Sequence, residues 1–324
     1  MFENLPTVLS SGEILDKAFR RAVRVSAYHP DRLKRRKIKS LSRLQTVRDI
    51  ITSTLEGYLN AFPRPEKLHP FYRDLLDLLV GEERYRRALS ELDWAVDMIL
   101  KLYKSYASKI RGARAEEDVE RARKAFYGRV SSIVEDIGWA LDELARARER
   151  LRVLPSIDPE TPLVIVAGAP NVGKSQLVRA LSTAEPEVAS YPFTTKRVHL
   201  GHMYCGPHRV QVLDTPGLLD RPFSRMKEPE RQAALALRRL PGLVVFLFDP
   251  SETCGYDLEY QRAVFEDVRR MHRGRVIVVE NKADISEPAG LGLRISALTG
   301  QGLDELKKII CDELGKRGWG SKTR

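Results

Sequence analysis

Hydrophobic side chains recur every three or four positions along residues 12–151. Because an α-helix has about 3.6 residues per turn, this spacing places the apolar side chains on one face of a helix. Such faces are buried against one another, so the pattern predicts a bundle of about four long helices. Ser11 is the expected N-cap of the first helix, Pro30 the expected start of the second, and Pro63 and Gly81 are expected helix ends. The predicted helices begin after Ser11, extend from Pro30 to about Ala61 and from Pro70 to Val80, and then follow the apolar stripes between Leu92 and Ile110 and between Val119 and Leu144.

The pattern changes after residues 152–161, where two prolines interrupt the helical periodicity. Short apolar runs then alternate with helical stretches, which is typical of an α/β fold with a mostly parallel sheet. We therefore expect a helical bundle domain over residues 1–155 and an α/β domain over residues 156–324. The apolar runs are Leu163–Ala167, Val210–Leu213, Leu243–Phe248 and Val276–Val279.

Residues 168–175 read GAPNVGKS and match the phosphate-loop pattern G-x-x-x-x-G-K-[ST]. They follow a predicted strand and precede a predicted helix, so the backbone N–H groups and the helix N-terminus can surround phosphates. Lys174 is expected to reach the β- and γ-phosphates, and Ser175 to ligate Mg²⁺. The nucleotide-binding residues predicted here are Gly168, Ala169, Pro170, Asn171, Val172, Gly173, Lys174, Ser175 and Gln176.

Two further segments carry groups suited to Mg²⁺ and the γ-phosphate. The strand Val210–Leu213 leads into Asp214-Thr-Pro-Gly217, in which Asp214 is expected to hold Mg²⁺ through water and the Gly217 N–H to sense the γ-phosphate. Residues 191–196 read YPFTTK, and a threonine there can close over Mg²⁺. We favour Thr195 over Thr194, although the spacing does not decide between them and also fits a plain loop before a strand.

Asn281-Lys282-Ala283-Asp284 follows the last long apolar run and identifies the base. The carboxylate of Asp284 can accept two hydrogen bonds from guanine N1–H and N2–H₂, a donor pair that adenine lacks. The four motifs in this order predict a GTP-binding protein of the P-loop class, with Asn171, Lys174, Thr195 and Gly217 as candidate catalytic residues. Further base contacts are expected from Asn281, Lys282, Ser296, Ala297 and Leu298.

The chain is basic, with a net charge of +11 and a pI of about 9.6. Residues 1–160 hold 31 basic and 25 acidic side chains, and residues 161–324 hold 24 and 19, so both halves are positive. Such a balance fits a polyanionic partner such as RNA, and equally a charge-rich surface in water. The sharpest cluster is RLKRRKIK at 32–39. Its cations Arg32, Arg35, Arg36 and Lys39, spaced three or four apart, are expected to share one helix face and bind RNA phosphates.

Other features of the sequence limit the cellular environments in which the protein is expected. No apolar run approaches the roughly 18 residues that span a membrane. Cys205, Cys254 and Cys311 lie far apart, which argues against disulfides or a zinc site and for a reducing cytoplasm. Few amides among many charges fit a thermophile. Trp94 and Trp139 lie beside the apolar stripes, so we expect them in the core.

The segments GAPNVGKS, YPFTTK, DTPGLLDRP and NKAD together resemble the nucleolar GTP-binding protein 1 family of Obg-like GTPases. The stretch at 214–222 and the preceding helical domain are the most specific marks, and the resemblance extends over essentially the whole chain. It implies a helical bundle followed by a Ras-like P-loop GTPase domain that hydrolyses GTP to GDP with Mg²⁺. It also implies a role in large ribosomal subunit assembly, through binding of ribosomal RNA or the subunit precursor. The chain is similar to short archaeal members, so functions tied to the eukaryotic C-terminal extension are not implied.

One position departs from small GTPases of the Ras type. Leu218 follows Gly217 where those enzymes carry a glutamine that orients the attacking water, so slow intrinsic hydrolysis is expected. In related GTPases an asparagine at the position of Asn171 helps hold a potassium ion, and we expect K⁺ to act here in the same way. Two alternatives stay open: a nucleotide-dependent interaction module with negligible hydrolysis, and an Obg-like factor acting on tRNA or translation. Nothing demands a dimer, so a monomer is expected.

Overall fold

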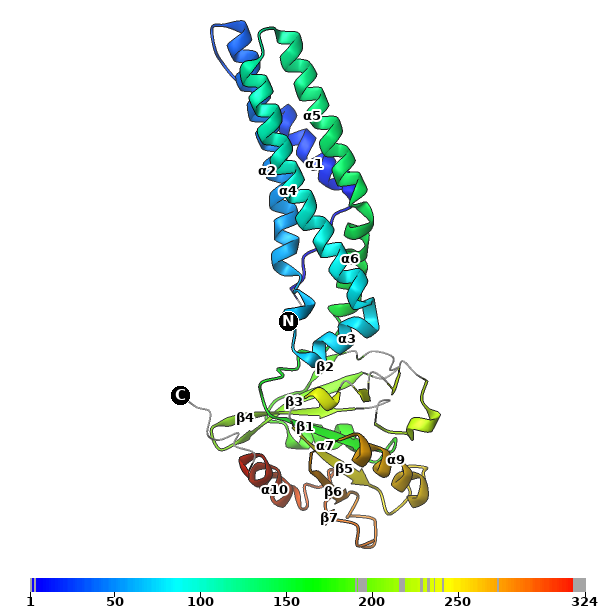
Figure 1. Ribbon diagram of the computed structural model, residues 1–324. Coiled ribbons are helices and arrows are strands. Elements are labelled where there is room, and N and C mark those ends of the chain that lie inside the picture. Colours follow the sequence, from blue (N-terminus) through cyan, green and yellow to red (C-terminus); the bar gives the residue numbers. More distant parts are fainter. Residues whose placement is uncertain are drawn as a thin grey trace. The chain divides into compact units, whose positions relative to one another are not determined.

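The computed structural model describes residues 2, 4–189, 191, 197–215, 219–227, 230–231, 234–235, 237–240, 242–272 and 274–316. The first half is helical, as predicted (Figure 1). The helices α1, α2, α4 and α5 pack side by side, and α6 packs on α4. None of the described helices is long and apolar enough to cross a membrane. Their bounds are α1 Ser11–Val23, α2 Arg32–Ala61, α4 Glu82–Gly112, α5 Glu116–Asp136 and α6 Gly138–Leu151.

Three boundaries differ from those predicted. The N-cap of α1 is Ser10 rather than Ser11, because the Ser10 hydroxyl accepts from the Glu13 N–H while the Glu13 carboxylate accepts from the Ser10 N–H. Helix α2 begins at Arg32, after Asp31 caps it through the Lys34 N–H. The last predicted helix is two helices, α5 and α6, separated at Ile137, whose ψ is 5°. The apolar stripe continues across this break, so periodicity alone could not show it.

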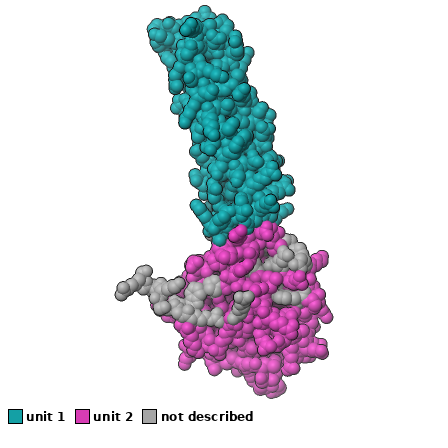
Figure 2. Space-filling view, in the orientation of Figure 1, with its two compact units in different colours: residues 1–68, 79–152 teal, residues 69–78, 153–324 magenta. Residues whose placement is uncertain are grey.

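Helix α3 (Pro70–Val80) ends just before Gly81, as predicted, but most of it groups with the second half of the chain. One compact unit holds residues 1–68 and 79–152, and the other holds residues 69–78 and 153–324 (Figure 2). The Tyr72 hydroxyl lies 3.2 Å from the Pro155 carbonyl oxygen and 2.5 Å from that of Ile157. Arg239 pairs with Asp74 at 2.9 Å. A segment of the predicted bundle domain therefore packs within the α/β unit.

The second unit is built on one sheet with the strand order β2-β3-β4-β1-β5-β6-β7. Strands β4, β1, β5, β6 and β7 are parallel, while β3 pairs antiparallel with β4 and β2 with β3. Carboxyl ends of parallel neighbours meet at one edge, which is where open α/β sheets bind ligands. The strands are β1 Leu163–Gly168, β2 Glu187–Ala189, β3 Val198–Cys205, β4 His208–Asp214, β5 Gly242–Phe248, β6 Val276–Glu280 and β7 Leu293–Arg294.

Helices cover both faces of this sheet. Helices α7 (Lys174–Leu181) and α10 (Leu303–Lys316) share a buried apolar cluster with alternate residues of β1 and β5. On the other face α9 (Leu258–Met271) packs Phe265 against Phe246, with ring centroids 5.1 Å apart. Short 3-10 turns η1 (Pro65–Lys67), η2 (Phe223–Arg225) and η3 (Leu237–Arg239) lie in the connections.

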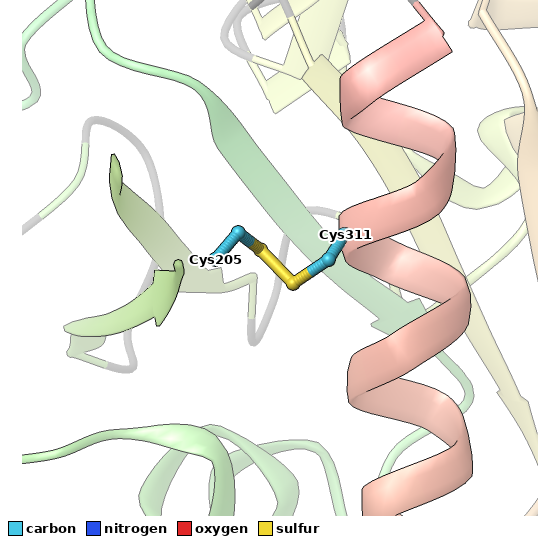
Figure 3. Close-up of a disulfide and its surroundings, with 2 residues drawn as sticks. All are labelled: Cys205 and Cys311. Carbon is cyan, nitrogen blue, oxygen red and sulfur yellow. A yellow bond between two sulfur atoms is a disulfide. The ribbon is translucent and has the colours of Figure 1, made fainter. Parts of the chain in front are cut away.

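A disulfide joins Cys205 at the end of β3 to Cys311 in α10 (Figure 3). The two Cα atoms lie 5.3 Å apart although the residues are 106 positions apart in the chain. The expectation that the cysteines stay unpaired is therefore wrong, because distance along the sequence says nothing about distance across a folded sheet. Cys254 is the buried free cysteine.

Candidate nucleotide-binding site

The segment 168–175 connects the end of β1 to the first residue of α7, in the strand–loop–helix context that its motif requires. Gly168 has φ 143°, and a Cβ there would lie 2.5 Å from the Leu247 carbonyl oxygen of β5. Gly173 has φ 102°, and a Cβ there would clash with the side-chain amide of Asn281. Both positions therefore require glycine for backbone conformation and for close packing.

Lys174 is buried at the start of α7. Its Nζ donates to the carbonyl oxygens of Gly168 at 2.9 Å and Ala169 at 2.8 Å. These hydrogen bonds hold the ammonium group within the loop whose N–H groups can surround phosphate oxygens. The arrangement can stabilise negative charge on the β- and γ-phosphates of a nucleotide.

Asp214 ends β4 and is fully buried, paired in register with Val166 of β1. The Ser175 hydroxyl donates to its Oδ2, while its Oδ1 is buried with no hydrogen-bond partner among the described residues. A buried carboxylate oxygen without a partner is costly, and Mg²⁺ prefers hard oxygen ligands. Ser175 and Asp214 together therefore fit a Mg²⁺ site. The Nδ1 atom of His199 lies 3.3 Å from the same Oδ2, a contact that the sequence did not indicate.

Asn281 joins three of the predicted motifs through one buried amide. Its Nδ2 donates to the Val172 carbonyl oxygen of the phosphate loop at 2.7 Å. Its Oδ1 accepts from the Ala297 N–H at 2.9 Å. The side chain thereby joins three segments: the predicted base-recognition segment (residues 281–284), the phosphate loop (residues 168–175) and residues 296–298.

Lys282 lies beside a buried carboxylate. Its Nζ donates to Asp249 Oδ2 at 2.6 Å and to the Thr253 hydroxyl at 2.8 Å. Burial would raise the pKa of Asp249, but hydrogen bonds from Lys282 and Ser251 outweigh it and hold the pKa below its ordinary value. Asp249 follows β5, the parallel neighbour of β1, so the position of a carboxylate after an apolar run was the available signal for it.

The groups predicted to contact the base differ in exposure. Asp284 is exposed, and Leu298 is 71% exposed, whereas Ser296 and Ala297 are buried. The Ala283 N–H donates to the Ile295 carbonyl oxygen at 3.0 Å, which ties the segment of Asp284 to that of Leu298. An exposed carboxylate can meet the edge of a purine, and an exposed apolar side chain can meet its face.

Backbone strain gathers around the same site. Within the described residues the non-glycine positions with positive φ are Asn171 at 63°, Glu252 at 56° and Lys282 at 62°. They lie in the phosphate loop, in the loop after β5 and in the base-recognition segment. Such conformations cost on the order of 1–3 kcal/mol each and persist where surrounding contacts hold them, commonly at functional sites.

Some predicted site residues lie outside the described part of the chain: Thr194, Thr195, Gly217 and Leu218. Their flanks are described. Tyr191 is buried, and the Thr215 hydroxyl donates to the Val166 carbonyl oxygen at 2.8 Å. Of the other predicted residues, Asn171 donates weakly from Nδ2 to the Cys254 carbonyl oxygen at 3.4 Å, and Gln176 is exposed.

Comparisons with known proteins agree with this arrangement. Residues 2–158 match the family described as "NOG1 N-terminal helical domain", and residues 163–282 match "50S ribosome-binding GTPase". An uncharacterized protein of Methanocaldococcus jannaschii is 37% identical over 88% of this chain and 81% of its own length. Nucleolar GTP-binding protein 1 of Encephalitozoon cuniculi is 33% identical over 81% of this chain and 52% of its own.

The chain belongs to the nucleolar GTP-binding protein 1 family. It spans about half the length of the relatives that carry this name. The relative from Saccharomyces cerevisiae is 30% identical over 90% of this chain and 45% of its own. A crystal structure of a family member from Plasmodium falciparum is 30% identical, covers 52% of this chain and 93% of that one, and superposes with a TM-score of 0.45. The predicted order, a helical domain followed by a P-loop GTPase domain with a mostly parallel sheet, is confirmed.

The four cations predicted to share one face of the family's helical domain do not behave alike. Arg32 pairs with Glu116 at 2.8 Å, and Arg36 lies 3.8 Å from both Glu116 and Glu120 of α5. Arg35 is exposed without an ion pair among the described residues, and Lys39 is half-buried. Two of the four are thus already partly neutralised. The two tryptophans expected in the core also differ from that expectation: Trp94 is 43% exposed, and Trp139 is half-buried beneath the Arg87 guanidinium.

Proposed function

We propose that this protein binds GTP with Mg²⁺, hydrolyses it to GDP and phosphate, and acts as a switch in assembly of the large ribosomal subunit. The observation that carries the nucleotide assignment is the position of Asn281. Its amide links the phosphate loop, the base-recognition segment and the segment 296–298, which otherwise lie far apart in the chain. Asp284 at the exposed end of this arrangement supports guanine as the base.

In this proposal each part of the site has one task. The loop N–H groups and Lys174 neutralise the β- and γ-phosphates, and the Asp284 carboxylate accepts from guanine N1–H and N2–H₂. Ser175, Asp214 and Thr195 would hold Mg²⁺, which would offset negative charge on the phosphates. The Gly217 N–H reports the presence of the γ-phosphate.

Hydrolysis transfers the γ-phosphoryl group to water. The water oxygen forms a bond to the γ-phosphorus, the bond from that phosphorus to the β–γ bridging oxygen breaks, and GDP leaves with its charge held by Lys174. One proton of the water stays on the inorganic phosphate and the other passes to solvent. Leu218 cannot hydrogen-bond to the water, so the intrinsic rate is slow. Asn171, in the phosphate loop, is the candidate ligand of a K⁺ ion that supplies further positive charge.

The ribosomal part of the proposal rests on the family and on charge. The words "50S ribosome-binding GTPase" describe the matching GTPase family, and the named relatives are nucleolar proteins. A net charge of +11 suits binding to ribosomal RNA, which is a polyanion. The proposal is therefore that the protein binds the large subunit or its precursor, and that it does so as a monomer.

Two measurements test the proposal. Multiple-turnover GTP hydrolysis is measured with and without purified large subunits, and co-sedimentation is measured with mature and precursor large subunits in GDP and in a non-hydrolysable GTP analogue. We expect slow turnover that subunits accelerate, and tighter binding in one nucleotide state. Turnover no faster than the uncatalysed reaction, both with and without subunits, would favour the alternative of a nucleotide-dependent interaction module with negligible hydrolysis. The non-polar Leu218 is the residue that supports this alternative. Co-sedimentation with neither form of the subunit would refute the ribosomal role.

A further inference from the structure

One end of the helical bundle carries an exposed aromatic ring. The connection between α1 and α2 and the connection between α4 and α5 both lie at this end (top of Figure 1). Tyr28 in the first connection is 89% exposed, and Val23 at the end of α1 is 69% exposed. A tyrosine buries a large apolar area when it can, so nearly full exposure of this ring marks a surface with no partner inside the unit.

Two hydrogen bonds join α2 to the C-terminal ends of α1 and α4 at this end of the bundle. The Arg43 guanidinium of α2 donates to the Val23 carbonyl oxygen at the end of α1, at 3.1 Å. The Lys37 ammonium of α2 donates to the Arg111 carbonyl oxygen at the end of α4, at 2.8 Å. Both bonds also cap helix C-termini with positive charge, which stabilises them. The surface is therefore built from fixed elements.

This end of the bundle holds most of the protein's excess positive charge. Residues 20–39 and 109–118 contain 12 basic and 4 acidic side chains, whereas the rest of residues 1–160 contain 19 basic and 21 acidic ones. Several of the cations are exposed and form no ion pair among the described residues. They are Arg24, Lys34, Arg35, Arg111 and Arg114, and together with Tyr28 we call them the bundle-end surface.

Resting on the proposed ribosomal function, we propose that the bundle-end surface binds single-stranded ribosomal RNA, with an unpaired base stacked on Tyr28. An aromatic ring among cations is the chemistry that recognises RNA loops, because unstacked bases pair with the ring while guanidinium groups bind the phosphates. A duplex offers phosphates but no free base face. The cations Arg32 and Arg36, already engaged by Glu116 and Glu120, are secondary in this arrangement.

The test uses the full-length chain and two labelled probes: an RNA stem-loop from the large-subunit RNA, and a fully paired duplex of the same stem. Tyr28→Ala is expected to weaken stem-loop binding by about 10- to 100-fold, the effect of one lost base–aromatic stack, and to leave duplex binding unchanged. Tyr28→Phe should bind as the wild type does. Arg35→Glu should weaken both probes and lower the salt dependence by about one unit of the log–log slope.

Trp94→Ala is the matched control, since Trp94 is also exposed in the same bundle but lies between Asp93 and Asp97. It should leave stem-loop binding intact. Equal stem-loop binding by wild type and Tyr28→Ala overturns the proposal, as does efficient displacement of the stem-loop by polyglutamate, which would indicate an acidic protein partner. Co-sedimentation with large subunits, run in parallel, separates the two hypotheses. Subunit binding without any effect of Tyr28→Ala refutes the bundle-end surface alone, whereas Tyr28-dependent stem-loop binding without subunit binding refutes the ribosomal function alone.

Discussion

Some side chains at the nucleotide site could be predicted from a sequence motif, whereas others could be found only from the fold. The glycines at 168 and 173 and the lysine at 174 follow from a motif whose spacing is set by the turn itself. The contact of Asn281 with Val172 spans 109 positions, and the pair of Asp249 with Lys282 spans 33. Such pairs depend on which strands are neighbours. The sequence predicted parallel strands but not their order, so it identified Lys282 and missed its partner.

The pair of Asp249 and Lys282 yields a prediction about nucleotide affinity. Asp249→Asn removes the charged partner of a hydrogen bond, an interaction of roughly 1.5–3 kcal/mol, and frees the Lys282 side chain within the predicted base-recognition segment. We expect GDP affinity to fall by about tenfold or more, measured by fluorescence titration with a labelled GDP. Glu259→Gln, an exposed carboxylate in the first turn of α9, is the control and should leave affinity unchanged. Wild-type affinity in Asp249→Asn at an unchanged melting temperature would show that the pair plays no part in binding.

Asn171 leads to a prediction about the choice of monovalent cation. Its φ of 63° suits asparagine, which tolerates the left-handed region better than most residues, and keeps the side chain at the exposed side of the loop. Hydrolysis should be faster in KCl than in NaCl at equal ionic strength, measured as phosphate release. Asn171→Ala should hydrolyse GTP at the same low rate in both salts. Equal rates of GTP hydrolysis by the wild type in KCl and NaCl would refute the potassium hypothesis.

Among the elements, periodicity predicted the helices well and their junctions poorly. The apolar stripes of α2 and α4 could be recognised in the sequence because one face of each helix is buried along most of its length. The break at Ile137 left the stripe in phase, and the packing of α3 within the α/β unit depends on Tyr72 and Asp74 meeting residues more than 80 positions away. The spacing of apolar residues shows which face of a helix is buried. It does not show which other element that face packs against.

The disulfide links two elements and predicts a stability difference. Cys205 and Cys311 are 106 positions apart, so the cross-link restricts a long loop of the unfolded chain, which in the entropic account is worth about 4–5 kcal/mol. Reduction, or the Cys205→Ser and Cys311→Ser variants, should lower the melting temperature by roughly 10 °C or more, measured by calorimetry with and without reductant. Intracellular proteins of hyperthermophiles are rich in disulfides, so such a bond is compatible with a thermophile's cytoplasm. A melting temperature that reductant does not change would show that the thiols are unpaired in solution.

At the scale of the whole molecule, the positive charge is unevenly placed. The first 160 residues carry their whole excess at the bundle end, and the remainder of that segment is slightly acidic. The net charge therefore suggested a polyanionic partner. Which cations are free to bind it depends on ion pairs that only the folded chain shows. The predicted cluster at 32–39 lies in the right region, but its members Arg32 and Arg36 face α5 and its acidic side chains.

The proposed switch requires that nucleotide state and partner binding be linked, and we infer that α3 takes part in this link. It continues in sequence into the bundle, while Asp74 pairs with Arg239. Burial, and to a lesser extent Tyr72 and Asp74, raises the pKa of Tyr191 at the start of the segment 191–196. We expect the ratio of large-subunit affinities with a GTP analogue and with GDP to differ from one by a factor of about 5–150, typical of allosteric coupling. By reciprocity, subunits must change the preference for the two nucleotides by the same factor, measured by nucleotide titrations with and without subunits.

The Asp74–Arg239 pair tests whether α3 carries that coupling. Arg239→Ala should bring the affinity ratio closer to one while leaving GDP affinity in the absence of subunits unchanged, because Arg239 lies outside the predicted nucleotide contacts. Arg238→Ala, at an exposed neighbouring arginine without a described ion pair, should keep the wild-type ratio. If both variants keep it, coupling passes through other contacts and α3 is only a packing element. If the wild-type ratio is itself one, nucleotide state does not control subunit binding and the proposed switch fails, whatever the rate of hydrolysis.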